Sequence, residues 1–135
     1  MGEKFLIDTN IVIASLGNQL PLEGAAFIKT VPPAISFITQ IELLGWHGVP
    51  AESLIPLNNF VHNSFIYYLN QEIIEQCIRP RQNHKIKTPD AIIAATALVH
   101  DLTLLTRNIS DFKKIIGLKL VNPFDIEEPL DFSAA

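Results

Sequence analysis

The chain has 135 residues, of which 48% are hydrophobic and 18% are charged, and its formal net charge is −4. This length and composition exclude a largely disordered chain and predict one domain with a single core. No apolar run approaches the roughly 20 residues that a membrane-spanning helix requires. The only cysteine is Cys77, which excludes an intrachain disulfide and favours a reducing, cytoplasmic location.

Short apolar runs alternate with helical segments along the chain. The predicted strands are residues 4–7, 34–38, 65–69, 102–105 and 118–121, and the predicted helices are residues 10–16, 22–29, 40–46, 50–61, 70–78, 88–99 and 111–116. Pro56 should interrupt the fourth helix and Pro80 should weaken the end of the fifth. The alternation indicates an α/β three-layer sandwich with a central, mostly parallel five-stranded sheet. We expect one domain over residues 1–123 and an exposed, mobile, acidic tail over residues 124–135.

The most informative stretch is TPDAIIAATALVHDLTLLTRNISDF, residues 88–112. Thr88 is the predicted N-cap of a helix, Pro89 stands at its first position and Asp90 places a carboxylate in its first turn. Of the nine residues that follow Asp90, only Thr96 is polar. Such a helix is typically packed inside a fold. The strand after it ends in a Thr-Arg-Asn sequence, at the place where α/β proteins position functional residues.

Four acids lie near predicted strand ends or helix starts, and each has a structural interpretation. Asp8 could be an N-cap, Thr39 with Glu42 fits a capping box, Asp90 suits the helix dipole, and Asn108 with Asp111 resembles another cap pair. Such caps contribute on the order of 1 kcal/mol each.

The set as a whole favours a second interpretation. Because the carboxyl ends of parallel strands meet at one edge of a sheet, the four carboxylates should converge and oppose one another's ionisation. A cation would relieve this repulsion. Ligands that are all oxygen favour Mg²⁺ or Mn²⁺, and the matching chemistry is metal-assisted hydrolysis of a phosphodiester.

Four motifs carry a resemblance to a known family. They are Asp8-Thr9-Asn10, Glu42 in ITQIELLGW, Asp90 in TPDAIIAATAL, and Thr106-Arg107-Asn108 with Asp111-Phe112 in LLTRNISDF. In this order they resemble a PIN domain and, within that superfamily, the VapC toxins of bacterial type II toxin–antitoxin systems. The motifs span residues 5 to 112, which is almost the whole chain.

The resemblance implies a Mg²⁺- or Mn²⁺-dependent endoribonuclease that acts on RNA as a homodimer. A cognate antitoxin would hold it inactive by covering the acidic groove with its C-terminal segment. The implied catalytic and metal-binding residues are Asp8, Glu42, Asp90 and Asp111, and Glu42 is expected to orient a water on the ion more than to touch the ion. The implied supporting or substrate contacts are Asn10, Thr106, Arg107 and Asn108, with Arg107 the best placed to contact a phosphate. Members of the family often have an acid where this chain has Asn108, so the number of ions stays open.

A basic segment precedes Asp90, because Arg79, Arg81, Lys85 and Lys87 fall within nine residues. It could draw the RNA backbone toward the acids or form a solvated loop, and the sequence favours neither.

Other enzyme classes are disfavoured. A phosphatase with a strand-end Asp nucleophile would need a second Asp at the position of Asn10, and no G-x-G, P-loop or H-E-x-x-H signature is present. Two alternatives stay open: an RNA-processing nuclease that is not a toxin, and an inactive PIN-like binding module whose acids only cap helices.

Overall fold

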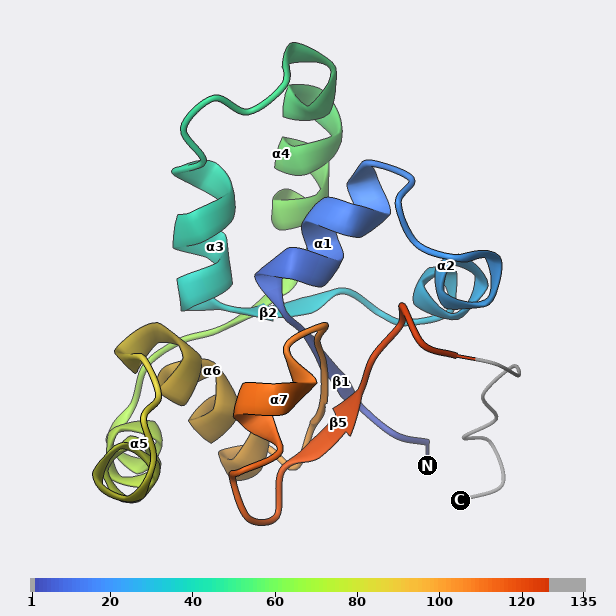
Figure 1. Ribbon diagram of the computed structural model, residues 1–135. Coiled ribbons are helices and arrows are strands. Elements are labelled where there is room, and N and C mark those ends of the chain that lie inside the picture. The colour runs from blue at the N-terminus through green and yellow to red at the C-terminus, as the bar shows by residue number, and fades with distance from the viewer. Residues whose placement is uncertain (1, 127–135) are drawn as a thin grey trace.

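The computed structural model describes residues 2–126, which fold into alternating strands and helices (Figure 1). The strands are β1 (Phe5–Ile7), β2 (Ala34–Ser36), β3 (Phe65–Tyr67), β4 (Thr103–Leu105) and β5 (Lys119–Val121). The helices are α1 (Thr9–Leu16), α2 (Leu22–Lys29), α3 (Phe37–Leu44), α4 (Leu54–Asn63), α5 (Gln71–Asn83), α6 (Thr88–Val99) and α7 (Ile109–Phe112), with a 3-10 turn η1 (Ala51–Ser53) before α4. Each strand lies within the apolar run that was predicted to form it.

All strand pairs are parallel, as the sequence predicted. β1, β4 and β5 form one sheet in that order, and β2 pairs with β3. β1 and β2 are neighbours in space, but no strand pairing joins them within residues 2–126. The prediction of one five-stranded sheet was therefore wrong. Each strand has only three residues, so a pairing between β1 and β2 would have few ladder bonds.

The strands carry a hydrophobic core on each face. Leu6 and Leu104 pack in one cluster with residues of α6 and α7, whereas Ile7 and Leu105 pack in another with residues of α1 to α4. Successive residues of a strand point to opposite faces, which produces this division. Figure 1 shows α1 to α4 on one side of the strands and α5 to α7 on the other. The three-layer arrangement is thus confirmed.

The structure differs from the prediction at the start of α3 and at the N-cap of α6. α3 begins at Phe37, because the Ser36 hydroxyl accepts a hydrogen bond from the Ile38 N–H at 3.1 Å. The capping box expected for Thr39 and Glu42 is therefore wrong, and both residues lie inside the helix. α6 has Lys87 as its N-cap, with Thr88 as its first residue and no side-chain cap. Asp90 remains in the first turn, as predicted.

Neither proline ends its helix. Pro56 occupies the third residue of α4, where a backbone N–H has no helical partner to lose. Pro80 lies inside α5, which continues to Asn83 rather than ending near Ile78. α5 packs along α6, and this packing compensates for the one hydrogen bond that a proline removes.

The last described residues pack against the rest of the domain. Phe124 and Ile126 pack against the core cluster that contains Ile7 and Leu105. The rest of the tail predicted over 124–135, residues 127–135, lies outside the described residues. Within residues 2–126, no helix is long and apolar enough to cross a membrane.

Candidate functional site

Asp8 and Thr106 form the floor of the site because they follow paired strands. β1 and β4 are in register with Ile7 opposite Leu105, so the next residue of each strand emerges at the same edge of the sheet. The Thr106 hydroxyl donates to Asp8 Oδ2 at 2.7 Å, and the Thr9 N–H donates to Asp8 Oδ1 at 2.8 Å. Asp8 is only 5% exposed and Thr106 is fully buried. Asp8 is also the N-cap of α1, so its capping role and its site position coexist.

Two asparagines complete the surroundings of Asp8. Asn10 Nδ2 donates to Asp8 Oδ2 at 3.3 Å, and Asn10 Oδ1 accepts the Arg107 N–H at 3.3 Å. The Asn108 N–H donates to the Thr106 hydroxyl at 3.0 Å. Asn10 and Thr106 therefore contact the buried carboxylate directly, and Asn108 contacts it through Thr106.

Glu42 reaches the same edge from the middle of α3. The Thr9 hydroxyl donates to Glu42 Oε1 at 2.6 Å and also hydrogen-bonds the buried Thr39 hydroxyl at 3.0 Å. Glu42 itself is exposed. Sequence reasoning missed Thr9 and Thr39 as the groups that position Glu42, although Thr9 stands between two residues of a recognised motif.

Asp90 and Asp111 are contributed by the first turns of α6 and α7. Asp90 is half-buried, and Asp111 is exposed. Asn108 Nδ2 donates to Asp111 Oδ2 at 3.1 Å, which is the cap-like pairing that the sequence suggested. Asn108, not Asp111, is the N-cap residue of α7, so the helix predicted to open at Asp111 begins slightly earlier.

The four carboxylates form one electrostatic cluster. Burial raises the pKa of Asp8, and the charges of Asp90 and Glu42 raise it further, against the lowering effect of the Thr106 and Thr9 hydrogen bonds. Burial also raises the pKa of Asp90, as do the charges of Glu42 and Asp111, while Lys87 opposes them. Asp90 is thus coupled to all three other acids and lies at the electrostatic centre of the cluster.

The donor set fits a hard divalent cation in its chemistry. All the candidate ligands are carboxylate oxygens, which Mg²⁺ and Mn²⁺ prefer. The carboxylates do not form a complete set of metal ligands in this structure: within residues 2–126, no group of three or more His, Cys, Asp or Glu side chains is arranged to hold a metal ion. Glu42 Oε1 and Asp111 Oδ2 instead accept hydrogen bonds from Thr9 and Asn108. The exposed Asp111 side chain would have to turn toward an ion, whereas Glu42 is held by Thr9.

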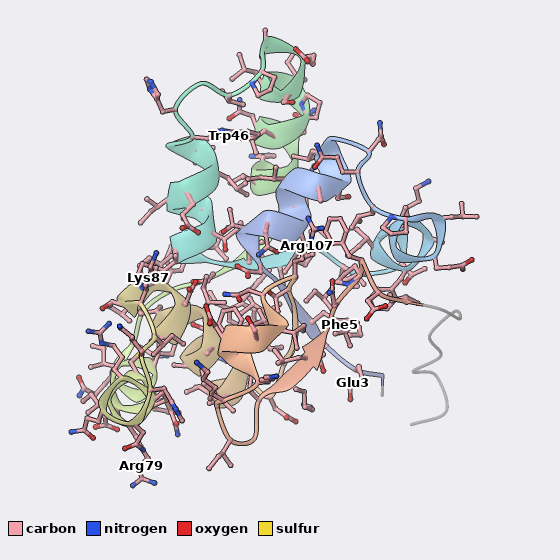
Figure 2. All side chains as sticks on the ribbon, in the orientation of Figure 1. Glu3, Phe5, Trp46, Arg79, Lys87 and Arg107 are labelled. Atoms are coloured by element: carbon pink, nitrogen blue, oxygen red, sulfur yellow. The ribbon has the colours of Figure 1, made fainter. Side chains whose placement is uncertain are left out.

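A cleft of about 730 Å³ opens beside Asp90, Asn108 and Asp111. Its other wall is the end of α5 and the loop that follows, namely Arg81, His84, Lys85, Ile86 and Lys87. Arg79 lines a different hollow. In Figure 2, Lys87 lies where α6 approaches α3, whereas Arg79 projects from α5 on the opposite side. The basic segment of the sequence is therefore divided, and sequence reasoning missed His84 as a wall residue.

Arg107 has a different neighbour from the one its position suggested. The centre of its guanidinium lies 4.1 Å from the centroid of the Phe124 ring, within the range of a cation–π contact. Its backbone N–H is bound to Asn10. Arg107 thus joins the segment after β5 to the residues around Asp8, and its phosphate contact stays a prediction.

The comparisons with known proteins agree with this architecture. The model of the PIN domain family matches residues 50–118. A 41-residue segment is 49% identical to Ribonuclease VapC1 of Rickettsia felis; it covers 30% of this chain and only 31% of that protein. In a toxin–antitoxin complex from Klebsiella pneumoniae, a similar chain is 35% identical, with a TM-score of 0.71 over 91% of this chain and 100% of that one.

A further solved structure resembles this chain in fold. DNA-bound VapBC from Salmonella typhimurium contains a chain that is 21% identical and has a TM-score of 0.75, over 90% of this chain and 98% of that one. The family model covers half of the chain, and the Klebsiella relative is covered over its full length. Together with the order of the acids on the strands and helices, these matches show that the chain belongs to the PIN domain family.

Proposed function

We propose that this protein is a Mg²⁺- or Mn²⁺-dependent endoribonuclease that hydrolyses RNA phosphodiester bonds and is the toxin of a VapBC-type toxin–antitoxin pair. The observation that carries the proposal is the cluster of Asp8, Glu42, Asp90 and Asp111 at the carboxyl edge of the strands. The names of the relatives, a ribonuclease VapC1 and a toxin–antitoxin complex, support it.

The acids and the residues around them would have different roles in the reaction. Asp8, Asp90 and Asp111 would hold the ion, which when bound supplies an activated water and stabilises charge on the phosphate. Thr106 and Asn10 fix the Asp8 carboxylate so that it needs little reorganisation. Thr9 holds Glu42 through Oε1, which leaves Oε2 to orient the attacking water and accept its proton.

The nuclease proposal is tested by cleavage of a structured RNA pool in Mg²⁺ or Mn²⁺ and in EDTA. We compare the unmodified protein with Asp90→Asn and with Asp101→Asn. Asp101 is a matched control because it is exposed, precedes β4 at the other end of the strand, and has a φ of 53°, which Asn also tolerates.

Loss of Asp90 should reduce cleavage by about a hundredfold or more, whereas Asp101→Asn should retain it and EDTA should abolish it. Circular dichroism checks that both variants fold. Equal cleavage by all three proteins would contradict the proposed site. Inert proteins that also bind no divalent ion by calorimetry would favour the binding-module alternative, in which the acids only cap helices.

The toxin role is tested by expression in a bacterial host without an antitoxin. The unmodified chain should arrest growth, and a folded Asp8→Asn variant should not. RNA cleavage in vitro without growth arrest would favour a processing nuclease that is not a toxin.

Two exposed apolar surfaces support the proposed partners. One follows β3 and α5 with Phe65, Tyr68, Leu69, Ile74 and Ile78, and suits the homodimer that the resemblance implies. The other lies on α3 and α4 with Ile41, Leu44, Leu54 and Ile55. Because α3 also carries Glu42, an antitoxin segment bound there would reach the acids. Ile74→Glu should dissociate a dimer in light scattering, and Ile41→Glu should weaken antitoxin binding without affecting dimerisation.

A further inference from the structure

The loop between α5 and α6 is anchored and turns at Lys85, where the Ile86 N–H donates to the His84 carbonyl at 3.1 Å. His84 and Lys87 both have extended backbone angles, with φ, ψ of −136°, 156° and −70°, 148°. Along it, His84 and Ile86 are partly buried, and Lys85 and Lys87 are exposed. Ile86 packs against the core cluster that contains Leu6, and Arg81 Nη1 donates to the Ile86 carbonyl at 2.9 Å. The loop therefore presents two lysines on one side from an anchored backbone.

The place of these lysines suits a polyanionic strand. Both lysines line the same cleft as Asp90, Asn108 and Asp111, so a backbone that follows them leads directly to the acids.

We propose that Lys85 and Lys87 bind phosphates of an unpaired RNA segment next to the bond that is cleaved. The inference rests on the proposed nuclease function and adds to it the path and the form of the substrate. A cleft of about 730 Å³ has the size of small-molecule pockets, roughly 300–1,000 Å³. Such a cleft accepts a nucleotide or two rather than a double helix.

A simpler role would be charge compensation alone. Lys87 lowers the pKa of Asp90 and so acts partly as its counter-charge. Lys85 is not among the groups that shift the pKa of Asp90, yet it is exposed on the same wall. A phosphate site therefore predicts that both lysines contribute to RNA binding, whereas charge compensation predicts an effect of Lys87 only.

The experiment measures binding of a fluorescent, unpaired RNA oligonucleotide by anisotropy at several salt concentrations. Asp90→Asn is the common background, so that no RNA is cut. Removal of one lysine–phosphate ion pair should reduce the slope of log K against log salt by about 0.7, so Lys85→Gln should lower it by about 0.7 and the Lys85→Gln/Lys87→Gln pair by about 1.4. Between 50 and 200 mM salt, the advantage of the background protein over the pair should then shrink by about sevenfold.

Arg79→Gln is the matched control, since it removes one positive charge from the same segment but lines a different hollow. It should leave the slope unchanged. In the otherwise unmodified enzyme, Lys85→Gln should raise KM with little change in kcat, and an RNA duplex of the same sequence should compete poorly.

Three results would overturn the inference. If the enzyme cuts RNA but the lysine pair leaves the slope unchanged and Lys85→Gln leaves KM unchanged, the inference fails and the proposed function stands. If the pair weakens binding of an antitoxin peptide and leaves RNA binding unchanged, the cleft is a protein site. If the unmodified protein neither binds nor cuts RNA in Mg²⁺ or Mn²⁺, both the inference and the proposed function fail.

Discussion

Thr106→Val tests whether the hydrogen bonds around Asp8 are as important as their geometry suggests. Valine has almost the shape of threonine, so packing at this fully buried position is preserved. The substitution removes the hydroxyl that donates to Asp8 Oδ2 and accepts from the Asn108 N–H. Its effects should therefore be electrostatic rather than steric.

The expected loss of stability has two sources. A hydrogen bond to a charged group contributes about 1.5–3 kcal/mol, and a buried donor left without its acceptor costs about 1–3 kcal/mol. The Asn108 N–H is only partly buried, which places its share near the low end, so the sum is roughly 2–4 kcal/mol. This is less than the total stability of a typical domain, about 5–15 kcal/mol, and the variant should fold. Because the Thr106 hydrogen bond lowers the pKa of Asp8, its loss should raise that pKa further and weaken divalent-ion binding.

The assay combines urea unfolding with calorimetric titration of Mn²⁺. Thr103→Val is the matched control, because Thr103 is buried in β4, the strand that ends just before Thr106, and its hydroxyl also donates to a carboxylate, that of Glu3. Both variants should lose stability, but only Thr106→Val should lose ion affinity. A loss below about 0.5 kcal/mol for Thr106→Val, or an equal loss of ion affinity in both variants, would refute the role assigned to Thr106.

Three further predictions concern stability in the absence of metal. Burial raises the pKa of Asp8 above its ordinary 3.8. The stability tied to its protonated form is therefore present below about pH 3.8 and is lost as the pH rises through the folded-state pKa. Asp8→Asn should thus have a higher melting temperature than the unmodified protein at pH 7, and the difference should shrink toward pH 4. Gly24→Ala should lower stability by about 1–3 kcal/mol in urea unfolding despite its better helix propensity, because the new Cβ would lie 1.8 Å from the Pro123 carbonyl oxygen; a neutral effect would show that the Pro123 backbone can move. Phe124→Ala removes the ring stacked on Arg107 and should cost about 1–3 kcal/mol in the same assay, whereas an unchanged midpoint would mean that the segment after β5 is not held by this contact.

The positions of the strands were predictable because buried parallel strands are nearly continuous apolar runs. The same signal failed at strand ends. In AISFI, residues 34–38, the apolar pattern continues past Ser36, but the strand stops there. The Ser36 hydroxyl caps a helix, and this local hydrogen bond outweighs the β propensity of the residues that follow. The capping box assigned to Thr39 and Glu42 was wrong for this reason.

The buried part of the site, Asp8 and Thr106, could be predicted from the sequence. The exposed part, which includes Glu42, could be predicted only in part. Asp8 and Thr106 each follow a strand directly, so strand register alone brings them together. Glu42 is six residues beyond β2, and its direction depends on where α3 begins. The contact from Thr9 to Glu42 joins residues that are 33 apart in sequence, and no local pattern encodes it.

The basic segment illustrates why spacing has no fixed meaning without secondary structure. Arg79 and Arg81 are two residues apart on helix α5, whereas Lys85 and Lys87 lie in the loop that follows it. Two residues rotate about 200° around a helix. The arginines therefore separate, with Arg81 in the cleft and Arg79 outside it, while both lysines stay in it.

The distribution of burial within the acid cluster bears on how an ion would enter it. Asp8 is buried and fixed by three donors, from Thr9, Asn10 and Thr106. Glu42 and Asp111 are exposed, and Asp111 can turn at little cost in packing. An ion approaching from solvent would thus meet the exposed carboxylates before the buried one. Its charge would offset the repulsion that raises the pKa of Asp8 and Asp90. Binding of the ion should therefore stabilise the fold. Because Asp8 carries the largest burial penalty, Asp8→Asn should abolish much of the stabilisation that the ion provides. The same substitution should raise the stability of the metal-free protein.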